Sequence, residues 1–542
     1  MRGWALLCAG FGMASRGSAA SHVSVAGRKE VTAAMHHAPV PAKSPRLRTG
    51  IIPTPVQKVA GLDSALTPHQ PPTSSVSACT MAGGIKFEHF PCGVDAARIP
   101  GRAPSVVMLG SMHAGSRGLA TNLAEEGYEV VLVDTTSGSA SLSALRKPPT
   151  RGEWVSDANL RETHGWAMAT NVLSLIDNAG GWNRYTALLT LGLEQEDADV
   201  VAALQVETSG KGGLSAYVAY GSQLQPGQAV EAAKRTMDAG LPFTAHVAED
   251  AQLVDALVQA AKSGEIPQSA LPFHPELDGF AAELGPVRPT TLAVFTYAVP
   301  NEASVWACAF PFSHHTKDYA FSTGMEDSHR SAAAMSYSRT VATLKAAMGP
   351  RFPLEQLWDQ HTYFEFATRS AARTMRTMVA QPYVNHIACL TGGAGYTQLA
   401  RFYQHHFTNV SPPDTTLVPI SRTIGADRII DEMVFSCTHT TVIDYFLPGV
   451  PPTGKKLRIP MVGIVNMRGD KLAYESLYWD QANTLTQLGL LHPTKSSLDP
   501  TVTLPIAGDQ VAQKILHPYG TPSNELMPNW PESENKPVPA DP

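Results

Sequence analysis

The feature that most constrains the fold is a pair of long strand-like runs near the C-terminus. They lie within residues 457–480, whose sequence is LRIPMVGIVNMRGDKLAYESLYWD. The two runs flank Gly469-Asp470, a dipeptide typical of a two-residue hairpin turn. The sequence therefore predicts a β-hairpin centred on these two residues.

A turn at Gly469-Asp470 also predicts which residues face one another across the hairpin. Side chains alternate between the two faces of a strand, so Tyr474, Ser476, Tyr478 and Asp480 are expected to share one face. That face is apolar apart from these four residues. The expected cross-strand pairs are Arg468–Lys471, Met467–Leu472, Val465–Tyr474, Met461–Tyr478 and Ile459–Asp480.

Asp480 is a candidate catalytic residue because it ends this apolar face. Removal from water disfavours the charged form of a carboxyl group and raises its pKa, which suits a general acid or base. The alternative is structural: Asp480 ends the strand and caps a helix that starts at Gln481. Both interpretations remain open at this point.

Composition excludes several classes of function. With 542 residues, 43% hydrophobic residues and a net charge of −6, the chain predicts two or three globular domains and shows no basic stripe for nucleic acid. The six cysteines are scattered without a C-x-x-C motif, so we expect no disulfide framework, no metal site, no cofactor and a cytoplasmic location. The chain contains no run of about 18 apolar residues, so the sequence predicts no membrane-spanning helix.

Four segments follow from the changes in composition. Residues 1–84 are rich in Pro, Ser, Ala and Thr and poor in acidic residues, which is typical of a disordered tail or an organellar targeting segment. A gene start at Met81 is a third interpretation. The remaining predicted segments are an α/β domain over 85–348, an α+β domain over 352–495 and a Pro-rich, irregular tail over 496–542.

The α/β domain is predicted from apolar runs that alternate with helix-like stretches. Such runs are typical of a doubly wound parallel sheet covered on both faces. Helices are expected over about 117–127 and 331–347. The expected strands are 105–111, 129–134, 199–206, 215–221, 241–250 and 291–299.

The α+β domain begins with helices and continues with strands. Helices are expected from 353, over 370–380 and over 396–407, and Trp358 and His361 lie at helical spacing on the apolar face of the first. A strand is expected at 382–393, then strands around 416–439 and the hairpin. This order predicts a strongly bent antiparallel sheet that follows the helices.

His386 is the second candidate catalytic residue. It shares an otherwise apolar face of the strand 382–393, where it could be the proton partner of Asp480 or a buried structural histidine. Tyr478 would help to orient a substrate. The residues expected to line the same pocket are Tyr363, Glu365, Met461, Tyr474 and Trp479.

Several stretches of the α+β domain resemble the SnoaL-like branch of the nuclear-transport-factor-like fold. They include PYVNHIACLTGG (382–393), SRTIGADRIIDEMVFSCTH (421–439) and LPGVPPTGKK (447–456) followed by two long strands. The resemblance implies a cone-shaped α+β domain with an apolar pocket. It also implies polyketide-cyclase, dehydratase or isomerase chemistry, in which a carboxylate such as Asp480 moves a proton beside a carbonyl. It further implies a homodimer formed through the sheet.

The α/β domain resembles a dienelactone hydrolase, a relative of the α/β-hydrolases. The stretch SVVMLGSMHAGSRGLATNLAEEGYEVVLVD (105–134) carries most of the resemblance. It implies a Cys nucleophile in a G-x-C-x-G turn, but the corresponding region 202–221 has no Cys. Asp250 or Glu249 would remain as the acidic residue, and Tyr319 occupies the position of the family's His. The sequence thus predicts a hydrolase-like domain without its nucleophile.

Three functions therefore remain. The first is an enzyme whose SnoaL-like domain binds a small apolar carbonyl compound and transfers a proton. The second is an ester or lactone hydrolase of the carboxymethylenebutenolidase type, and the third is a non-catalytic ligand-binding or assembly protein. A small-molecule partner is expected in the first two, and neither nucleic acid nor a membrane is expected in any.

Overall fold

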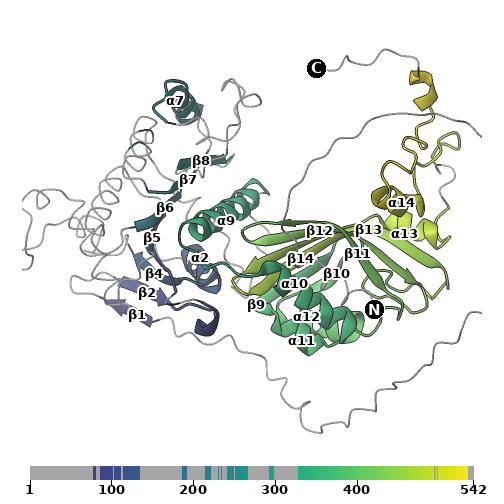
Figure 1. The fold of residues 1–542 in the computed structure, drawn as a ribbon, viewed down its shortest axis with the longest axis horizontal. Coiled ribbons are helices and arrows are strands. Elements are labelled where there is room, and N and C mark those ends of the chain that lie inside the picture. Colours follow the sequence, from purple (N-terminus) through teal and green to yellow (C-terminus); the bar gives the residue numbers. More distant parts are fainter. Residues whose placement is uncertain are drawn as a thin grey trace, which may run out of the picture. The chain divides into compact units, whose positions relative to one another are not determined.

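The computed structural model describes two sheets with their helices (Figure 1). The residues that it describes are 77–80, 86–99, 101, 103–110, 114–134, 186–191, 214–220, 230, 234, 241–248, 251–266, 292–297, 327–492, 496 and 498–534.

The first sheet has eight strands among the described residues, in the order β1-β2-β4-β3-β5-β6-β7-β8. Strands β3 to β8 pair in parallel, whereas β2 pairs antiparallel with both β1 and β4. Strands β3 to β6 are mostly apolar and buried, as a sheet covered on both faces requires, whereas the edge strand β8 is largely half-buried. The strands are β1 (Ser77–Thr80), β2 (Lys86–Phe90), β3 (Ser105–Gly110), β4 (Glu129–Asp134), β5 (Thr186–Leu191), β6 (Leu214–Tyr220), β7 (Phe243–Ala248) and β8 (Leu292–Tyr297).

The predictions for this domain are confirmed for five of the six expected strands. The sixth, at 199–206, lies outside the described residues, as do Glu249, Asp250 and Tyr319. Strand β5 was not predicted, and β1 lies inside the segment expected to be disordered. The described helical segments are η1 (Ala96–Arg98), α2 (Ala114–Glu125), α7 (Ala251–Lys262) and α9 (Asp327–Met348).

A buried histidine connects the first sheet to α9. His246 on β7 is fully buried; its Nδ1 lies 2.9 Å from the Tyr297 hydroxyl and its Nε2 lies 3.1 Å from Thr340 Oγ1. Burial, and secondarily the positive charge of Arg339, lower the pKa of His246 to about 3. The imidazole is therefore neutral, and its hydrogen bonds account for both ring nitrogens.

The second sheet has six strands, in the order β10-β9-β14-β13-β12-β11. Only β14 and β9 pair in parallel, and the other neighbours are antiparallel. The strands are β9 (Met378–His386), β10 (Thr391–Ala394), β11 (Thr416–Ile424), β12 (Arg428–Thr438), β13 (Lys456–Arg468) and β14 (Lys471–Trp479).

Helices group against one face of this sheet (Figure 1). Ser370 caps the N-terminus of the helix 371–376, where its side chain accepts a hydrogen bond from the backbone N–H of Arg373. Two of the segments are π-helical turns, which are rare and are often found at functional sites. The helices are α10 (Leu354–Thr362), α11 (Ala371–Arg376) and α12 (Tyr396–Phe402), and the π-helices are η7 (Tyr363–Ala367) and η8 (Tyr403–Phe407).

Two expectations for this part of the chain are wrong. Residues 378–380, expected at the end of a helix, begin strand β9, where Met378 pairs with Leu472 of β14 and both Met378 and Val379 are buried. The tail expected to be irregular contains α14 (Gln510–Leu516) and η9 (Trp530–Ser533), while α13 (Gln481–Gln487) follows the hairpin. Helices α13 and α14 both pack against β13.

The hairpin turn and the predicted pairs Arg468–Lys471 and Met467–Leu472 are confirmed, but the predicted register beyond these two pairs is wrong. Strands β13 and β14 end and begin on either side of Gly469-Asp470, and Gly469 has a φ of +56°. Beyond the second pair, Ala473 is inserted as a β-bulge, so Asn466 pairs with Tyr474. One inserted residue moves every following side chain to the opposite face.

The inner face of the second sheet also carries a buried carboxylate, Asp431. Both of its oxygens accept from the guanidinium of Arg422, at 2.7 and 2.8 Å, and one accepts from the Trp358 indole nitrogen at 2.8 Å. Asp431 is only 4% exposed, so these bonds replace its lost hydration. The carboxylate thereby ties α10 and β11 to β12.

Replacing Asp431 with Asn is expected to destabilise this domain. The variant loses the charge that pairs with Arg422 in a nearly buried position, and breaking such a pair costs about 3 kcal/mol. The adjacent Glu432 is less buried and bonds only Ser421, so Glu432→Gln is a matched control with a change of about 0.5 kcal/mol or less. Urea unfolding of the full chain, followed by tryptophan fluorescence, measures both. Equal midpoints for the two variants would contradict this role of Asp431.

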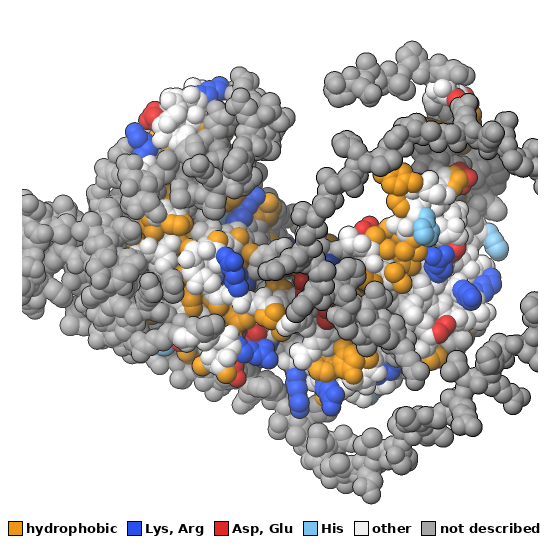
Figure 2. All heavy atoms as spheres, in the orientation of Figure 1, with side chains coloured by type: hydrophobic (Ala, Val, Ile, Leu, Met, Phe, Trp, Pro, Cys, Tyr) orange, Lys and Arg blue, Asp and Glu red, His pale blue; other side chains and the backbone are white. Residues whose placement is uncertain are grey.

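The described helices are too short or too polar to cross a bilayer. On the face drawn in Figure 2, side chains of both charges lie among hydrophobic and neutral ones. This mixture agrees with the small net charge of the chain.

Candidate functional site

The candidate site is built from a helix, a π-helical turn and the bulged strand. His361 lies in the last turn of α10, on the apolar face that also presents Leu357 and Trp358 to the core. Glu365 follows four residues later in η7, so its side chain lies beside that of His361. Both side chains are buried, at 0% and 4% exposure.

Glu475 reaches the same place from β14. The bulge at Ala473 pairs Glu475 with Val465, whose side chain is in the core, and so turns the carboxyl group inward. Without the inserted residue, Glu475 would face the outer side of the sheet. Glu475 is 3% exposed.

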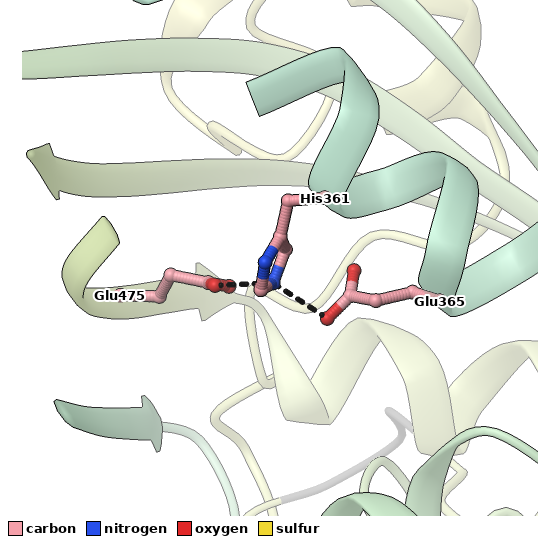
Figure 3. A group of neighbouring side chains, drawn as sticks. All are labelled: His361, Glu365 and Glu475. Atoms are coloured by element: carbon pink, nitrogen blue, oxygen red, sulfur yellow. Dashed lines mark hydrogen bonds and ion pairs between the residues drawn. The ribbon is translucent and has the colours of Figure 1, made fainter. Parts of the chain in front are cut away.

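The carboxyl groups of Glu365 and Glu475 converge on one atom, Nε2 of His361 (Figure 3). Glu365 Oε1 lies 3.1 Å from it and Glu475 Oε1 lies 3.0 Å from it. Nε2 has hydrogen-bond geometry toward Glu365. Glu475 Oε1 is buried but has no hydrogen-bond partner. One ring nitrogen cannot satisfy two carboxylates, so this cluster contains an unused acceptor.

The other ring nitrogen of His361 is fixed by Thr377. The Thr377 hydroxyl lies 2.5 Å from Nδ1 and donates its own hydrogen to the carbonyl of Thr374 at 2.6 Å. The hydroxyl must therefore accept from Nδ1, which carries a hydrogen. Any change in the protonation of His361 is thus confined to Nε2.

The pKa shifts in the cluster indicate that His361 and Glu475 share a proton. Burial lowers the pKa of His361, but Glu365 and Glu475 raise it by more, to about 10. Burial and the nearby Glu365 raise the pKa of Glu475, against the opposing effect of His361. A carboxyl group with a raised pKa, beside a cationic imidazole, can both accept and return a proton.

Tyr403 completes the surroundings of the cluster. Its hydroxyl lies 3.4 Å from His361 Nε2 and bonds Glu365. Burial and the charges of Glu475 and Glu365 hold the pKa of this phenol well above its usual range. Tyr403 is therefore a neutral hydrogen-bond donor and not an additional charge.

The same three residues are also a chemically sensible set of metal ligands. One imidazole nitrogen and two carboxylate oxygens lie within 4.8 Å of one another, a donor set that suits a divalent transition metal. A histidine ligand commonly donates its second ring N–H to a nearby acceptor, as His361 does to Thr377. A cation would displace the proton now shared at Nε2.

Asp480 has the structural role that the sequence left open. It is exposed at the N-terminus of α13, where its side chain accepts from the backbone N–H of Asn483 at 3.0 Å. Tyr478 is 44% exposed, because the bulge places it on the face opposite Trp479. The expectation that Asp480 and Tyr478 share the apolar inner face is therefore wrong, and their catalytic roles stay untested predictions.

The expected pocket residues divide between the two faces. Glu365 is buried in the cluster, and Met461 lies in the core. Trp479 is half-buried on the same inner face, with its indole nitrogen bonded to Gln481. Tyr363 is 54% exposed, and Tyr474 stacks on Tyr383 away from Glu475, so these two were wrongly expected inside.

His386 is buried on the inner face, as expected, among aromatic side chains. The rings of Phe402, Phe407, Tyr445 and Trp479 surround it at centroid distances of 5.6 to 6.0 Å. Burial lowers the pKa of His386 to about 4, so its ring is neutral. No contact with Asp480 is present among the described interactions of either residue.

Comparison with known proteins gives matches to solved structures alone. No family model matches the chain, and no curated protein matches it. A protein of ketosteroid isomerase-like fold from Catenulispora acidiphila, solved with trimethylamine, is 15% identical over 26% of this chain and 96% of its own, with a TM-score of 0.21.

Two further structures give similar values. A putative SnoaL-like polyketide cyclase from Jannaschia is 18% identical over 27% of this chain and 99% of its own, with a TM-score of 0.21. TsrD from Streptomyces laurentii is 14% identical over 26% of this chain and 99% of its own, with a TM-score of 0.22. Each of these three matches covers about a quarter of this chain and nearly all of the solved structure.

Proposed function

We propose that the domain formed by the second sheet is an enzyme that moves a proton beside the carbonyl of a small apolar compound. The proposed acid/base is Glu475, with His361 supplying positive charge beside it and Glu365 holding the imidazole. The products of such chemistry are those of an isomerase, a cyclase or a lyase. The observation that carries this proposal is the buried Oε1 of Glu475, which has no hydrogen-bond partner and forms an ion pair of 3.0 Å with His361 Nε2.

The chemistry follows from the charges of the cluster. A carboxylate removes a proton from the carbon next to a carbonyl, and negative charge develops on the carbonyl oxygen. The positive charge of His361 can lower the energy of that developing negative charge in an interior without water. Mostly apolar side chains surround the cluster, which favours an apolar substrate.

Hydrogen–deuterium exchange tests the proposal directly. The full chain is incubated in D2O with 1-tetralone, an apolar ketone with exchangeable hydrogens beside its carbonyl, and exchange is followed by proton NMR. Catalysed exchange at the carbon next to the carbonyl is expected, and none above the buffer rate would contradict acid/base chemistry on such ketones.

The same assay distinguishes a metal-dependent site. If the proton-transfer assignment is correct, exchange persists after treatment with EDTA, and added Mn2+ or Zn2+ inhibits it by occupying Nε2 of His361. Exchange that disappears with EDTA and returns with one of these ions would overturn the role given to Glu475. The three residues would then be metal ligands.

An ester or lactone hydrolase is the second candidate, and it rests on the resemblance of the α/β domain. Hydrolysis of a dienelactone by the full chain, retained in a Glu475→Gln variant, would favour it. No nucleophile–histidine–acid cluster occurs among the residues described in the first domain.

A further inference from the structure

We infer that the first domain positions the pair formed by Glu475 and His361, because residues of α2 and α9 hold the turn of the β13–β14 hairpin. The positioning residues are Glu126, which directly follows α2, and Gly469 in the turn. The inference rests on the proposed function, in which Glu475 and His361 are the reacting groups. It gives the first domain a part in that reaction.

The first argument is that the hairpin turn is buried. Turns normally lie on the surface of a protein, because their backbone groups need water or another polar partner. Gly469 is nevertheless buried, and its backbone N–H donates to Glu126 Oε2 at 3.1 Å. The preceding residue, Arg468, donates to Glu125 Oε2 at 2.7 Å. The turn is therefore bonded to carboxylates of the first domain.

The second argument is that the carboxylate beneath the turn is itself fixed. Glu126 is fully buried; its Oε1 accepts from the Tyr337 hydroxyl at 3.0 Å, and its Oε2 lies 2.7 Å from Lys345 Nζ. Both of these partners belong to α9, and Lys345 also donates to the carbonyl of Ala426, between β11 and β12, at 2.9 Å. A buried carboxylate with all its oxygens bonded is confined to one position.

The third argument is the closeness of the contact. Gly469 has a φ of +56°, and a Cβ added to it would lie 2.2 Å from the carbonyl oxygen of Glu125 and 2.9 Å from Val94 Cγ2. The first of these atoms belongs to the backbone and cannot rotate away. Only glycine therefore allows α2 to approach the turn in this way.

The fourth argument is that the turn is connected to both members of the pair. Leu472, three residues beyond the turn glycine, donates its backbone N–H to the carbonyl of Thr377 at 2.9 Å. Thr377 is also the residue whose hydroxyl accepts from His361 Nδ1. The next residue, Ala473, is the bulge that turns Glu475 inward. A displacement of the turn therefore reaches His361 through Thr377, and it reaches Glu475 through the bulge.

Substitution of the turn glycine tests this inference. Gly469→Ala forces the turn away from α2. Gly449→Ala is a matched control, because Gly449 also has a positive φ, +73°, but a Cβ added there meets no atom within 4 Å. Two quantities are measured on the full chain: the deuterium exchange of 1-tetralone, and the proton NMR resonance of the His361 imidazole N–H. That resonance is assigned by its absence in His361→Gln.

Gly469→Ala is expected to lower the turnover number for exchange about tenfold, because displaced reacting groups lose rate. The Michaelis constant should stay the same, since the apolar walls that bind the ketone are unchanged. The His361 resonance should move as well, which it would not do if the turn only stabilised the fold. Gly449→Ala is expected to match the wild type in all three quantities.

Arg98→Ala is a second variant that loosens the same turn. Arg98 pairs with Asp470 and its side chain is 54% exposed, so the fold tolerates its removal. The expected result is a turnover number about threefold lower, with the His361 resonance moved in the same direction. Where Gly469→Ala folds, its result decides; where it does not, that of Arg98→Ala decides. Wild-type rate and resonance in the deciding variant, or the same losses in Gly449→Ala, would overturn the inference.

These outcomes are separable from those of the proposed function. A His361 resonance that moves in Gly469→Ala, without any exchange by the wild-type chain, would retain the link from the turn to His361 and reject the catalysis. Wild-type exchange that Gly469→Ala leaves unchanged, with the resonance in place, would retain the catalysis and reject the positioning role of the first domain.

Discussion

Glu475→Gln is expected to reduce deuterium exchange by about a thousandfold. The amide keeps the size and one oxygen of the carboxyl group but cannot accept a proton, and loss of a general base typically costs a factor of 10²–10⁴ in rate. Binding of the ketone should change little, because the substitution leaves the apolar walls intact. The expected pattern is therefore a lower turnover number with an unchanged Michaelis constant.

Two further variants make this result specific. Asp444→Asn alters a histidine–carboxylate pair of the same length, 3.0 Å to His406, at a half-exposed position, and it should leave exchange unchanged. Asp480→Asn tests the residue favoured by the sequence, and full activity in that variant would reject its catalytic role. Wild-type exchange by a correctly folded Glu475→Gln protein, shown by an unchanged circular dichroism spectrum, would reject the role of Glu475.

The stability of the second domain is expected to fall steeply as the pH rises from 7 to 10. His361 has a pKa of about 10 in the folded chain and about 6.5 when unfolded, so its stabilising contribution is complete below pH 6.5. Between the two values the folded state holds a proton that the unfolded state has lost. The free energy of unfolding then decreases by up to about 1.4 kcal/mol per pH unit.

Glu475 also makes the domain less stable as the pH rises. Because its pKa is raised on folding, the folded state also retains that proton longer than the unfolded state does. His246 and His386 have the opposite effect on stability, because folding lowers their pKa values to about 3 and about 4. They reduce the free energy of unfolding only as the pH falls below 6.5.

The measurement is urea unfolding of the full chain at several pH values, beside His361→Gln. Lysines and tyrosines that titrate near pH 10 affect both proteins, so the difference between the two slopes isolates His361. The wild-type slope should be the steeper from pH 7 to 9. Equal slopes would show that His361 is not a buried cation.

The bulge at Ala473 is the main reason why the sequence could predict only part of the candidate site. Hydrophobic alternation and the Gly469-Asp470 turn located the hairpin correctly, but they could not reveal an inserted residue. A bulge depends on the pairing of β14 with both neighbours, and its register shifts at this residue on both sides. Tyr474, Tyr478 and Asp480 were therefore placed on the inner face that Glu475 occupies.

A usable signal for the site was nevertheless present. The sequence places His361 at helical spacing with Trp358 on the first helix, and Glu365, four positions further on, is a predicted pocket residue. A histidine and a carboxylate at that spacing on an apolar helix face need a buried partner, which is a reason to search for a third charged group. Its identity required the three-dimensional pairing of β14.

The hydrogen bond from His361 to Thr377 has a consequence for what the site can produce. With Nδ1 committed, the imidazole cannot carry a proton from one side of its ring to the other, as a relay to solvent requires. Glu475 and Nε2 of His361 therefore exchange protons with the substrate and with water on the same side of the imidazole. The deuterium that reaches a substrate carbon enters from that side and not through a relay across the ring of His361.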